Sequence, residues 1–211
     1  GVYLSEYAKK GPVTNFVRTC IEILSSLPSV VVGLFGYLIF VVQFEYGFSI
    51  ISGALALTVF NLPQMTRNVE DSLRHVHHTQ REAGLALGIS RWETVLHVVI
   101  PEALPSIVTG IVLASGRIFG EAAALIYTAG QSAPALDWSN WNIFSVTSPI
   151  SIFRQAETLA VHIWKVNSEG TIPDGTAVSA GSAAVLLIFI LIFNLGARKL
   201  GSYLHKKLTS A

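Results

Sequence analysis

The sequence predicts an all-α membrane protein, built as a polytopic bundle of transmembrane helices. Hydrophobic residues make up 51% of the chain and charged residues only 13%, about half the charged share of an average soluble domain. Four apolar runs, at residues 27–44, 50–66, 106–129 and 177–197, are long enough to cross a hydrocarbon core of about 30 Å. Positive charges gather on one side of these runs, which is typical of a multi-pass membrane protein.

The first half of the chain alternates between polar and apolar segments. Residues 1–20 are polar and basic and are expected to form a short surface segment with a break at Gly11 and Pro12. The first apolar run contains no charge, and Pro28 lies in its first turn, where proline is tolerated. In the second run, Pro63 is expected to kink the helix near its end.

A polar loop at residues 67–105 carries the signals of a helical hairpin. Helix formers continue to Leu87, and Gly88 offers the left-handed conformation that ends a helix at little cost. Ser90 and Glu93 have the spacing of a capping box, which starts a second helix. We expect this second helix to run to about residue 100, where Pro101 interrupts it.

The third apolar run contains two charges, Arg117 and Glu121, four residues apart and therefore on one face of a continuous helix. A charge in the middle of a membrane is costly, so such residues normally face a bundle interior or a water-filled path. Mostly small residues share this face: Gly110, Ala114, Gly120, Ala124 and Thr128. Two interpretations stay open, an anion path beside a close-packed helix and a structural ion pair.

The segment at residues 130–176 is a polar and aromatic outer loop. Apolar residues between Ile152 and Trp164 follow helical spacing and predict an amphipathic helix on the membrane surface. Trp138 and Trp141 suit a membrane interface. The alternative is that these tryptophans and Arg154 contact a partner protein outside the cell membrane.

The distribution of Lys and Arg predicts the orientation of the chain. Eleven of them lie on the side of the hairpin: Lys9, Lys10, Arg18, Arg67, Arg74, Arg81, Arg91, Arg198, Lys199, Lys206 and Lys207. Only Arg154 and Lys165 lie on the other side. The positive-inside rule therefore places the hairpin and the C-terminus in the cytoplasm.

Several kinds of site are not indicated. The net charge of +1 gives no sign of nucleic-acid binding, and the single cysteine, Cys20, excludes an internal disulfide. No ligand set for a metal and no cofactor site is visible, and we interpret three neighbouring histidines as solvated surface: His75, His77 and His78. No phosphate-binding G-x-x-x-x-G-K-[ST] loop is present, so the chain is not expected to hydrolyse ATP or to be an enzyme.

The hairpin resembles the EAA loop of ABC importer permeases of the MetI-like superfamily. Their pattern is Glu-Ala-Ala, three residues, Gly, nine residues, Ile, any residue and Leu-Pro, and every spacing matches from Glu82 to Pro101. The departures are Gly84, Val98 and Ile100. The resemblance implies the type I importer fold, with a cytoplasmic coupling hairpin that meets an ATPase. The residues implied in that contact are Glu82, Ala83, Gly84, Leu87, Gly88, Ser90, Arg91 and Trp92.

The stretch from Thr109 to Leu125 resembles the A-type subunit of phosphate-specific ABC permeases. Arg117, Gly120 and Glu121 match residue for residue, whereas Ala122 and Ala124 replace the usual Thr and Pro. The opening Gly-Val-Tyr-Leu-Ser-Glu-Tyr and the Leu-Pro-Ser-Val segment at 27–30 are also similar to this family. The resemblance covers residues 1–211 as one transmembrane domain and implies that upstream helices are missing from the chain.

This resemblance implies a permease subunit of an ATP-driven phosphate importer in a bacterial plasma (inner) membrane. Its partners would be a homologous C-type permease subunit, an ATP-binding cassette ATPase dimer, an extracytoplasmic phosphate-binding protein and the lipid bilayer. The substrate path would include Arg117, Gly120, Glu121 and Thr128. Arginine binds oxyanions through a fork of donors, and Glu121 is a candidate acceptor for the proton that phosphate carries and sulfate lacks.

Three alternatives stay open at this point. The first is an importer for another oxyanion, such as sulfate or molybdate, which the EAA loop fits equally well. The second is a self-contained channel or secondary carrier, which leaves the hairpin unexplained. The third is a membrane scaffold without transport, for which Arg117 would serve assembly alone.

Overall fold

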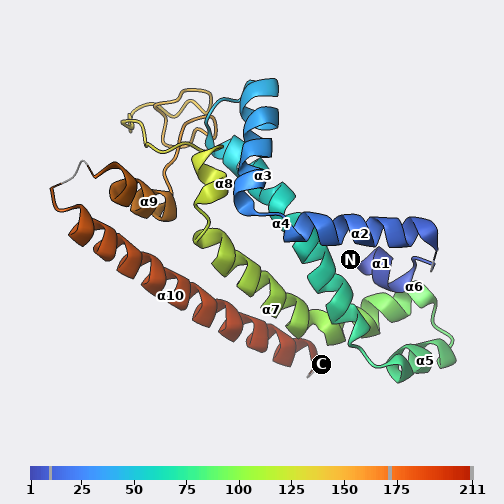
Figure 1. The fold of residues 1–211 in the computed structure, drawn as a ribbon. Helices are drawn as coiled ribbons and strands as arrows, with labels where there is room; N and C mark the ends of the chain where they lie inside the picture. The colour runs from blue at the N-terminus through green and yellow to red at the C-terminus, as the bar shows by residue number, and fades with distance from the viewer. Residues whose placement is uncertain (10, 171–172, 210–211) are drawn as a thin grey trace. The chain divides into compact units, whose positions relative to one another are not determined.

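The computed structural model describes residues 1–9, 11–170 and 173–209, which are helical or irregular and contain no strand (Figure 1). This confirms the all-α prediction. Lys10 and residues 171–172 of the predicted outer loop lie outside the described residues, as do the side chains of Lys206 and Lys207. The elements in chain order are α1 (Val2–Glu6), α2 (Pro12–Ser26), α3 (Ser29–Gly36), the π-helix η1 (Tyr37–Gln43), α4 (Ile50–Arg74), α5 (His78–Ala86), α6 (Arg91–Thr94), the π-helix η2 (Val95–Val99), α7 (Ile100–Phe119), α8 (Ala123–Ile126), α9 (Leu159–Glu169) and α10 (Gly175–Thr209).

Among the described residues, two helical stretches are long and apolar enough to cross a membrane, Arg91–Phe119 and Gly175–Tyr203. A third is added if the bent pair Pro12–Ser26 and Ser29–Gln43 forms one broken span. The prediction of four spans is therefore not met as stated. Helix α4 continues beyond its apolar half into a charged half that ends at Arg74, and the run at 27–44 is divided between α3 and η1.

The chain divides into two compact units, and each is described by itself. Unit 1 comprises Gly1–Ser25, Leu62–Gly116 and Ile192–Ala211. Its buried core is formed by Leu73, Val76, Val99 and Ala103, so the end of α4 packs on η2 and on the start of α7. Val2 of α1 packs against the same core. The predicted surface segment at 1–20 thus contains two helices, α1 and most of α2, and Pro12 begins the second of them.

Unit 2 comprises Ser26–Asn61 and Arg117–Leu191. Its helices approach closely because glycines stand at the contacts. A Cβ at Gly33 would lie 2.8 Å from Ala124 Cα, and one at Gly36 would lie 2.9 Å from the Ala56 methyl group. Helix α8 therefore packs on α3 with almost no side chain between the two backbones.

Two helix boundaries on either side of the predicted third span differ from the prediction. The third apolar run is not one helix, because α7 ends at Phe119 and α8 begins only at Ala123. The second hairpin helix does not end at Pro101, because α6, η2 and α7 continue as one helical stretch of 29 residues. The π-helical turn directly before Pro101 changes which carbonyls are paired, so the missing proline N–H is tolerated.

The amphipathic helix of the outer loop begins later than predicted. Helix α9 starts at Leu159, where the Thr158 side chain caps it, and residues 152–158 are irregular. The carbonyls of Ile152 and Arg154 instead accept hydrogen bonds from the backbone N–H groups of Ile51 and Ile50, both at 2.9 Å. They satisfy donors that the first turn of α4 leaves unpaired.

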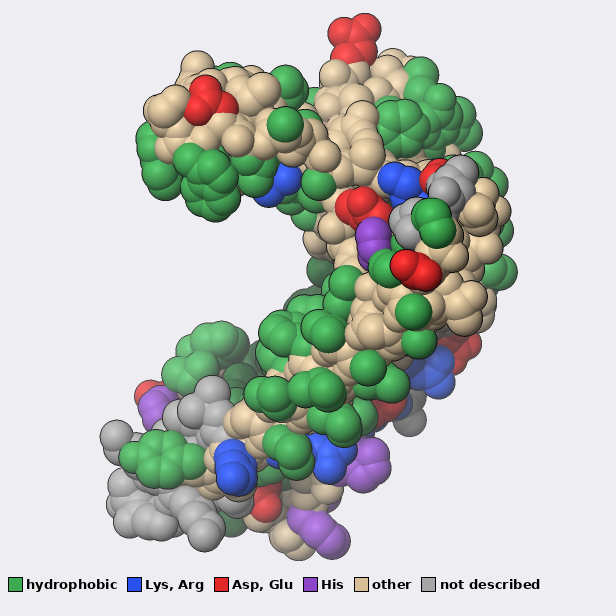
Figure 2. All heavy atoms as spheres, turned by 90° about the vertical axis from the view of Figure 1, so that its left-hand side faces the viewer, with side chains coloured by type: hydrophobic (Ala, Val, Ile, Leu, Met, Phe, Trp, Pro, Cys, Tyr) green, Lys and Arg blue, Asp and Glu red, His purple; other side chains and the backbone are tan. Residues whose placement is uncertain are grey.

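The surface agrees with a membrane environment. On the face shown in Figure 2, hydrophobic side chains form broad patches, and Lys and Arg side chains are confined to a few places. Large apolar side chains along α10 are exposed, among them Leu187, Leu191 and Leu195. Such exposure is expected where lipid, and not water, surrounds a helix.

Candidate functional site

Helices α5 and α6 form the predicted hairpin, and its local signals are confirmed. Gly88 has a φ of +79° in the turn, the left-handed region that favours glycine. The Ser90 hydroxyl accepts a hydrogen bond from the Glu93 N–H at 3.2 Å, and the Glu93 carboxylate accepts one from the Ser90 N–H at 2.8 Å. This reciprocal capping box fixes the start of α6.

The two helices of the hairpin touch at Gly84. An added Cβ there would lie 2.7 Å from Thr94 Cγ2, so glycine at this position permits the close approach of α5 to α6. The opposite side of the hairpin is open: Glu82, Ala83 and Arg91 are exposed. Leu87 is 82% exposed and Trp92 is 57% exposed, so the hairpin carries large apolar side chains on its surface.

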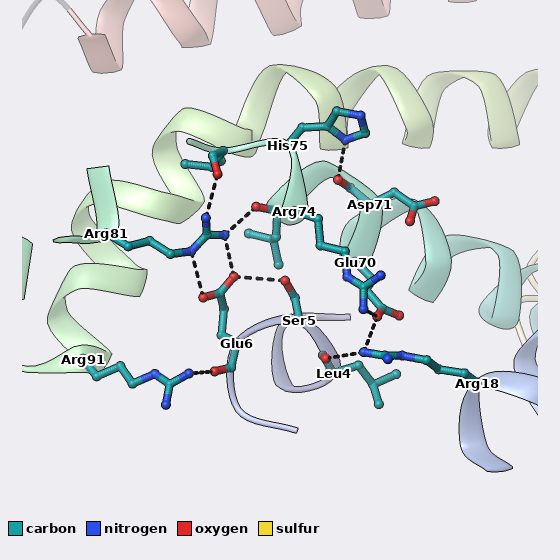
Figure 3. A network of polar contacts seen from close by, with 12 residues as sticks. Leu4, Ser5, Glu6, Arg18, Glu70, Asp71, Arg74, His75, Arg81 and Arg91 are labelled. Carbon is teal, nitrogen blue, oxygen red and sulfur yellow. Dashed lines mark hydrogen bonds and ion pairs between the residues drawn. The ribbon is translucent and has the colours of Figure 1, made fainter. Parts of the chain in front are cut away.

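Arg81 joins the hairpin to two other elements of unit 1 (Figure 3). Its guanidinium donates to both Glu6 carboxylate oxygens, at 2.8 and 3.2 Å. It also donates to the carbonyls of Leu73 and Val76, at 2.7 and 2.6 Å, at the end of α4. Burial raises the pKa of the Glu6 carboxyl, but hydrogen bonds from Arg81 and Ser5 outweigh it, and the pKa lies below its ordinary value.

Glu6 was not among the site residues predicted from the sequence. In the structure it is a buried carboxylate of unit 1, with 7% of its surface exposed. Arg91 adds a hydrogen bond to the Glu6 carbonyl and lies over the Tyr7 ring, 5.3 Å from its centroid. A groove of about 230 Å³ is lined by Glu6, Arg81, Arg91 and their neighbours. The sequence feature that could have drawn attention to Glu6 is that it is the one acidic residue among the first 20.

The predicted path residues lie in unit 2. Arg117 is exposed in the last turn of α7, with its guanidinium 4.5 Å from the centroid of the buried Phe60 ring. Glu121 lies in the break between α7 and α8, and its carboxylate accepts a hydrogen bond from the Ala124 N–H at 3.3 Å. The expectation that Arg117 and Glu121 share one face of a continuous helix is wrong, since the helix ends between them.

The other two path residues differ in their surroundings. Thr128 is fully buried and donates to the Ala124 carbonyl at 2.8 Å. Gly120 is exposed in the turn that ends α7. The structure thus places Glu121 and Thr128 at the two ends of the short helix α8. Glu121 caps its start, and Thr128 lies beside Gly36 of α3.

Asparagines were missed as polar groups of the membrane region. Asn61 is buried in unit 2, and its Oδ1 has no hydrogen-bond partner among the described residues. In unit 1, Asn68 lies against Gly110, and Asn194 of α10 lies 3.4 Å from a Cβ position at Gly116. Gly110, one of the predicted small residues, therefore permits a close contact, and an asparagine side chain fills it.

The outer loop presents aromatic side chains on a hydrogen-bonded scaffold in unit 2. Trp138 is 70% exposed and Trp141 is 61% exposed. The Asp137 N–H donates to the Thr147 carbonyl at 2.9 Å, which closes the loop. Arg154 donates to the Gln155 carbonyl at 3.2 Å.

Comparison with known proteins assigns this geometry to a family of transport proteins. The family model described as binding-protein-dependent transport system inner membrane component matches residues 1–210. The chain is 60% identical to the probable ABC transporter permease protein YqgI of Bacillus subtilis (strain 168), across 100% of the chain and 71% of that protein. It is 36% identical to the phosphate transport system permease protein PstA of Xylella fastidiosa (strain 9a5c), across 95% of the chain and 65% of that protein.

A solved structure has the same fold. It is described as inward facing conformations of the MetNI methionine ABC transporter, and the match covers 96% of this chain and 82% of that one. The TM-score is 0.70 at 18% sequence identity. This likeness confirms the predicted type I importer fold.

Proposed function

We propose a function from the premise that this chain belongs to the family of binding-protein-dependent transport system inner membrane components. It is an ABC importer permease, and its cargo is inorganic phosphate. The observation that carries the cargo assignment is the 36% identity, over 95% of the chain, to a permease named for phosphate transport. The chain spans 71% and 65% of the two relatives named above.

Arg117 is the proposed anion-binding residue of the path. Its guanidinium is a fork of donors that matches phosphate oxygens. Stacking on Phe60 holds the charge near one position while leaving side-chain surface exposed. A single arginine per subunit attracts a passing anion without enclosing it. Glu121, Gly120 and Thr128 complete the proposed path, with Glu121 as acceptor for a proton on phosphate.

The hairpin of α5 and α6 is the proposed contact with the ATPase. It exposes Leu87 and Trp92, and α6 is continuous with η2 and α7, whose last turn carries Arg117. A movement of the hairpin would therefore act directly on the helix that carries the anion-binding residue. In this proposal the chain hydrolyses no ATP. Closure of two ATPase subunits in the cytoplasm makes the anion path open alternately to one side of the membrane and to the other.

The proposed assembly has the partners that the family implies. A homologous permease subunit completes the path, and an extracytoplasmic binding protein delivers the anion to the side of the outer loop. Residues 67–105 would be the cytoplasmic coupling loop, and residues 130–176 the outer loop, of one transmembrane domain in the inner membrane.

An importer for another oxyanion is the second candidate. It stays a candidate because the relative with 60% identity has a name that gives no substrate. Sulfate would satisfy Arg117 equally well but has no proton to give to Glu121. A secondary carrier or channel fits less well, because it gives no role to the exposed hairpin.

The test uses the full-length permease with its partner permease, ATPase and binding protein in proteoliposomes. Uptake of radiolabelled phosphate is measured with and without ATP and with excess sulfate. ATP-dependent uptake that sulfate does not compete supports the proposal. ATP-dependent uptake of sulfate in place of phosphate would keep the importer and replace its cargo, and uptake without ATP would indicate a carrier or channel.

A further inference from the structure

Helix α1 is held by three arginines that come from three different elements of unit 1 (Figure 3). Arg18 of α2 donates to the Leu4 carbonyl at 3.1 Å. Arg81 of α5 binds the Glu6 carboxylate through two donors, and Arg91 of α6 donates to the Glu6 carbonyl. Five residues are too few to be stable as an isolated helix. The position of α1 is therefore set by these contacts and by its packing on the core.

The contact between Arg81 and Glu6 fixes the relative orientation of the two side chains as well as the distance between them. A two-donor contact between a guanidinium and a carboxylate is planar and oriented. The same guanidinium donates to the carbonyls of Leu73 and Val76, so it joins α5, α1 and the end of α4 at one point. Its side chain is 20% exposed and that of Glu6 is 6% exposed, so solvent screens the contact only weakly.

A second contact joins the middle of α1, at Leu4, to α2 and α4. Besides its bond to Leu4, Arg18 lies 2.9 Å from the Glu70 carboxylate, whose side chain is 8% exposed. Arg74 lies 2.8 Å from the same oxygen. A chain of oriented contacts thus runs from the hairpin through Glu6 and α1 to Arg18, and from there to Glu70 on α4.

We propose that α1 is a brace of the coupling hairpin, in which Glu6 is the positioning residue that makes α2 and α4 follow the hairpin when it moves. This inference rests on the proposed function, because it assigns a second route from the ATPase contact into the membrane helices. The first route is the continuous helix that begins with α6. With the brace intact, hairpin movement turns α4 and α7 together. Without it, α4 is joined to the hairpin only by the bonds from Arg81 to Leu73 and Val76 and by the shared core, and it follows the hairpin less closely.

The test is the ratio of phosphate taken up to ATP hydrolysed, in complexes of equal assembled amount. Glu6→Gln removes the charge and keeps the size of the side chain. The expected result is ATP hydrolysis at or above the wild-type rate, with about tenfold less phosphate moved per ATP, which corresponds to about 1.4 kcal/mol of lost coupling. The matched control is Glu22→Gln, an exposed carboxylate 3.6 Å from Arg67, for which the ratio should stay unchanged.

A second variant acts on the other end of the brace and leaves the hairpin untouched. Arg18→Gln removes the bond to Leu4, while Arg74 still pairs with Glu70, so the variant should assemble even if Glu6→Gln does not. A lowered ratio for this variant supports the brace, and an unchanged ratio in either assembled variant overturns it. If the wild-type complex neither takes up phosphate nor hydrolyses ATP in response to the binding protein, the proposed function fails instead.

Discussion

Charged side chains connect α1 to its neighbours in unit 1, whereas small residues bring α3 and α8 together in unit 2. In unit 1, Arg18, Arg81 and Arg91 connect α1 to three neighbours through oriented hydrogen bonds. In unit 2, α3 and α8 meet at Gly33, with backbone against backbone. Oriented polar contacts fix the direction of the elements they join, whereas backbone contacts between small residues fix how closely two helices pack. The position of α1 therefore depends on a few charged side chains, and the packing of α8 depends on the absence of side chains.

The largest expected effect is on the rigid contact of unit 2. A methyl group at Gly33 would meet Ala124 Cα at 2.8 Å and the Ala123 carbonyl oxygen at 3.1 Å, and neither backbone atom can rotate away. We expect Gly33→Ala to destabilise the protein by about 3 kcal/mol through overpacking. Thermal unfolding of the purified permease in detergent measures this.

The control for Gly33→Ala is Gly181→Ala in α10, where nothing lies within 4 Å of the added Cβ. Because alanine favours helix over glycine, this variant should be stabilised by about 0.5–1 kcal/mol. Equal unfolding temperatures for the two variants would contradict the close-contact description of unit 2.

The next largest effect is expected in the brace of unit 1, as a function of pH. The folded pKa of Glu6 lies below its ordinary value of 4.5, so its stabilisation is present above pH 4.5 and is lost as pH falls through the folded pKa. Glu6→Gln should cost about 2 kcal/mol near neutral pH, the value of a buried hydrogen bond to a charged group. The difference in unfolding temperature from wild type should shrink below pH 4.5, and a constant difference would contradict this account of Glu6.

A smaller effect is expected at the break between α7 and α8. Glu121→Gln retains an oxygen that accepts from the Ala124 N–H, so the cap of α8 is kept while the charge is lost. If Glu121 accepts a proton from phosphate, the preference for phosphate over sulfate should fall about tenfold, or about 1.4 kcal/mol. Competition uptake measures it, and an unchanged preference would leave Glu121 only as the cap of α8.

The smallest effect is expected inside the hairpin. Gly84→Ala places a methyl group 2.7 Å from Thr94 Cγ2, a side-chain atom that can shift, so the cost should be about 1 kcal/mol. Thr94→Ser removes that methyl group and keeps the hydroxyl that donates to the Ser90 carbonyl. Because the Thr94 hydroxyl oxygen also lies 2.9 Å from the added Cβ, the double variant should recover part of the loss. Additive losses would contradict direct contact between the two positions.

Local signals explain what could be predicted from the sequence. The hairpin depends on Gly88 and on the Ser90–Glu93 pair, all within six residues, and the structure reproduces its turn and its capping box. The all-α fold follows from composition and from long apolar runs. Family membership was predicted from the spacing around Glu82, which is also a local pattern.

Contacts between distant residues explain what could not be predicted. Glu6 and Arg81 are 75 positions apart, so no local pattern joins them. The late start of α9 depends on the carbonyls of Ile152 and Arg154, which accept hydrogen bonds from backbone N–H groups in the first turn of α4. The helical period continues through Gly120 and Glu121, and it predicts one helix where the structure has a break.

The measurement that tests the account most directly is phosphate uptake by the complete importer carrying Arg117→Ala, with assembly and ATP hydrolysis measured in the same vesicles. We expect an assembled complex in which the binding protein still stimulates ATP hydrolysis but which takes up almost no phosphate. Wild-type uptake in that complex would contradict it, because Arg117 on Phe60 would then be a structural contact and the anion would cross elsewhere.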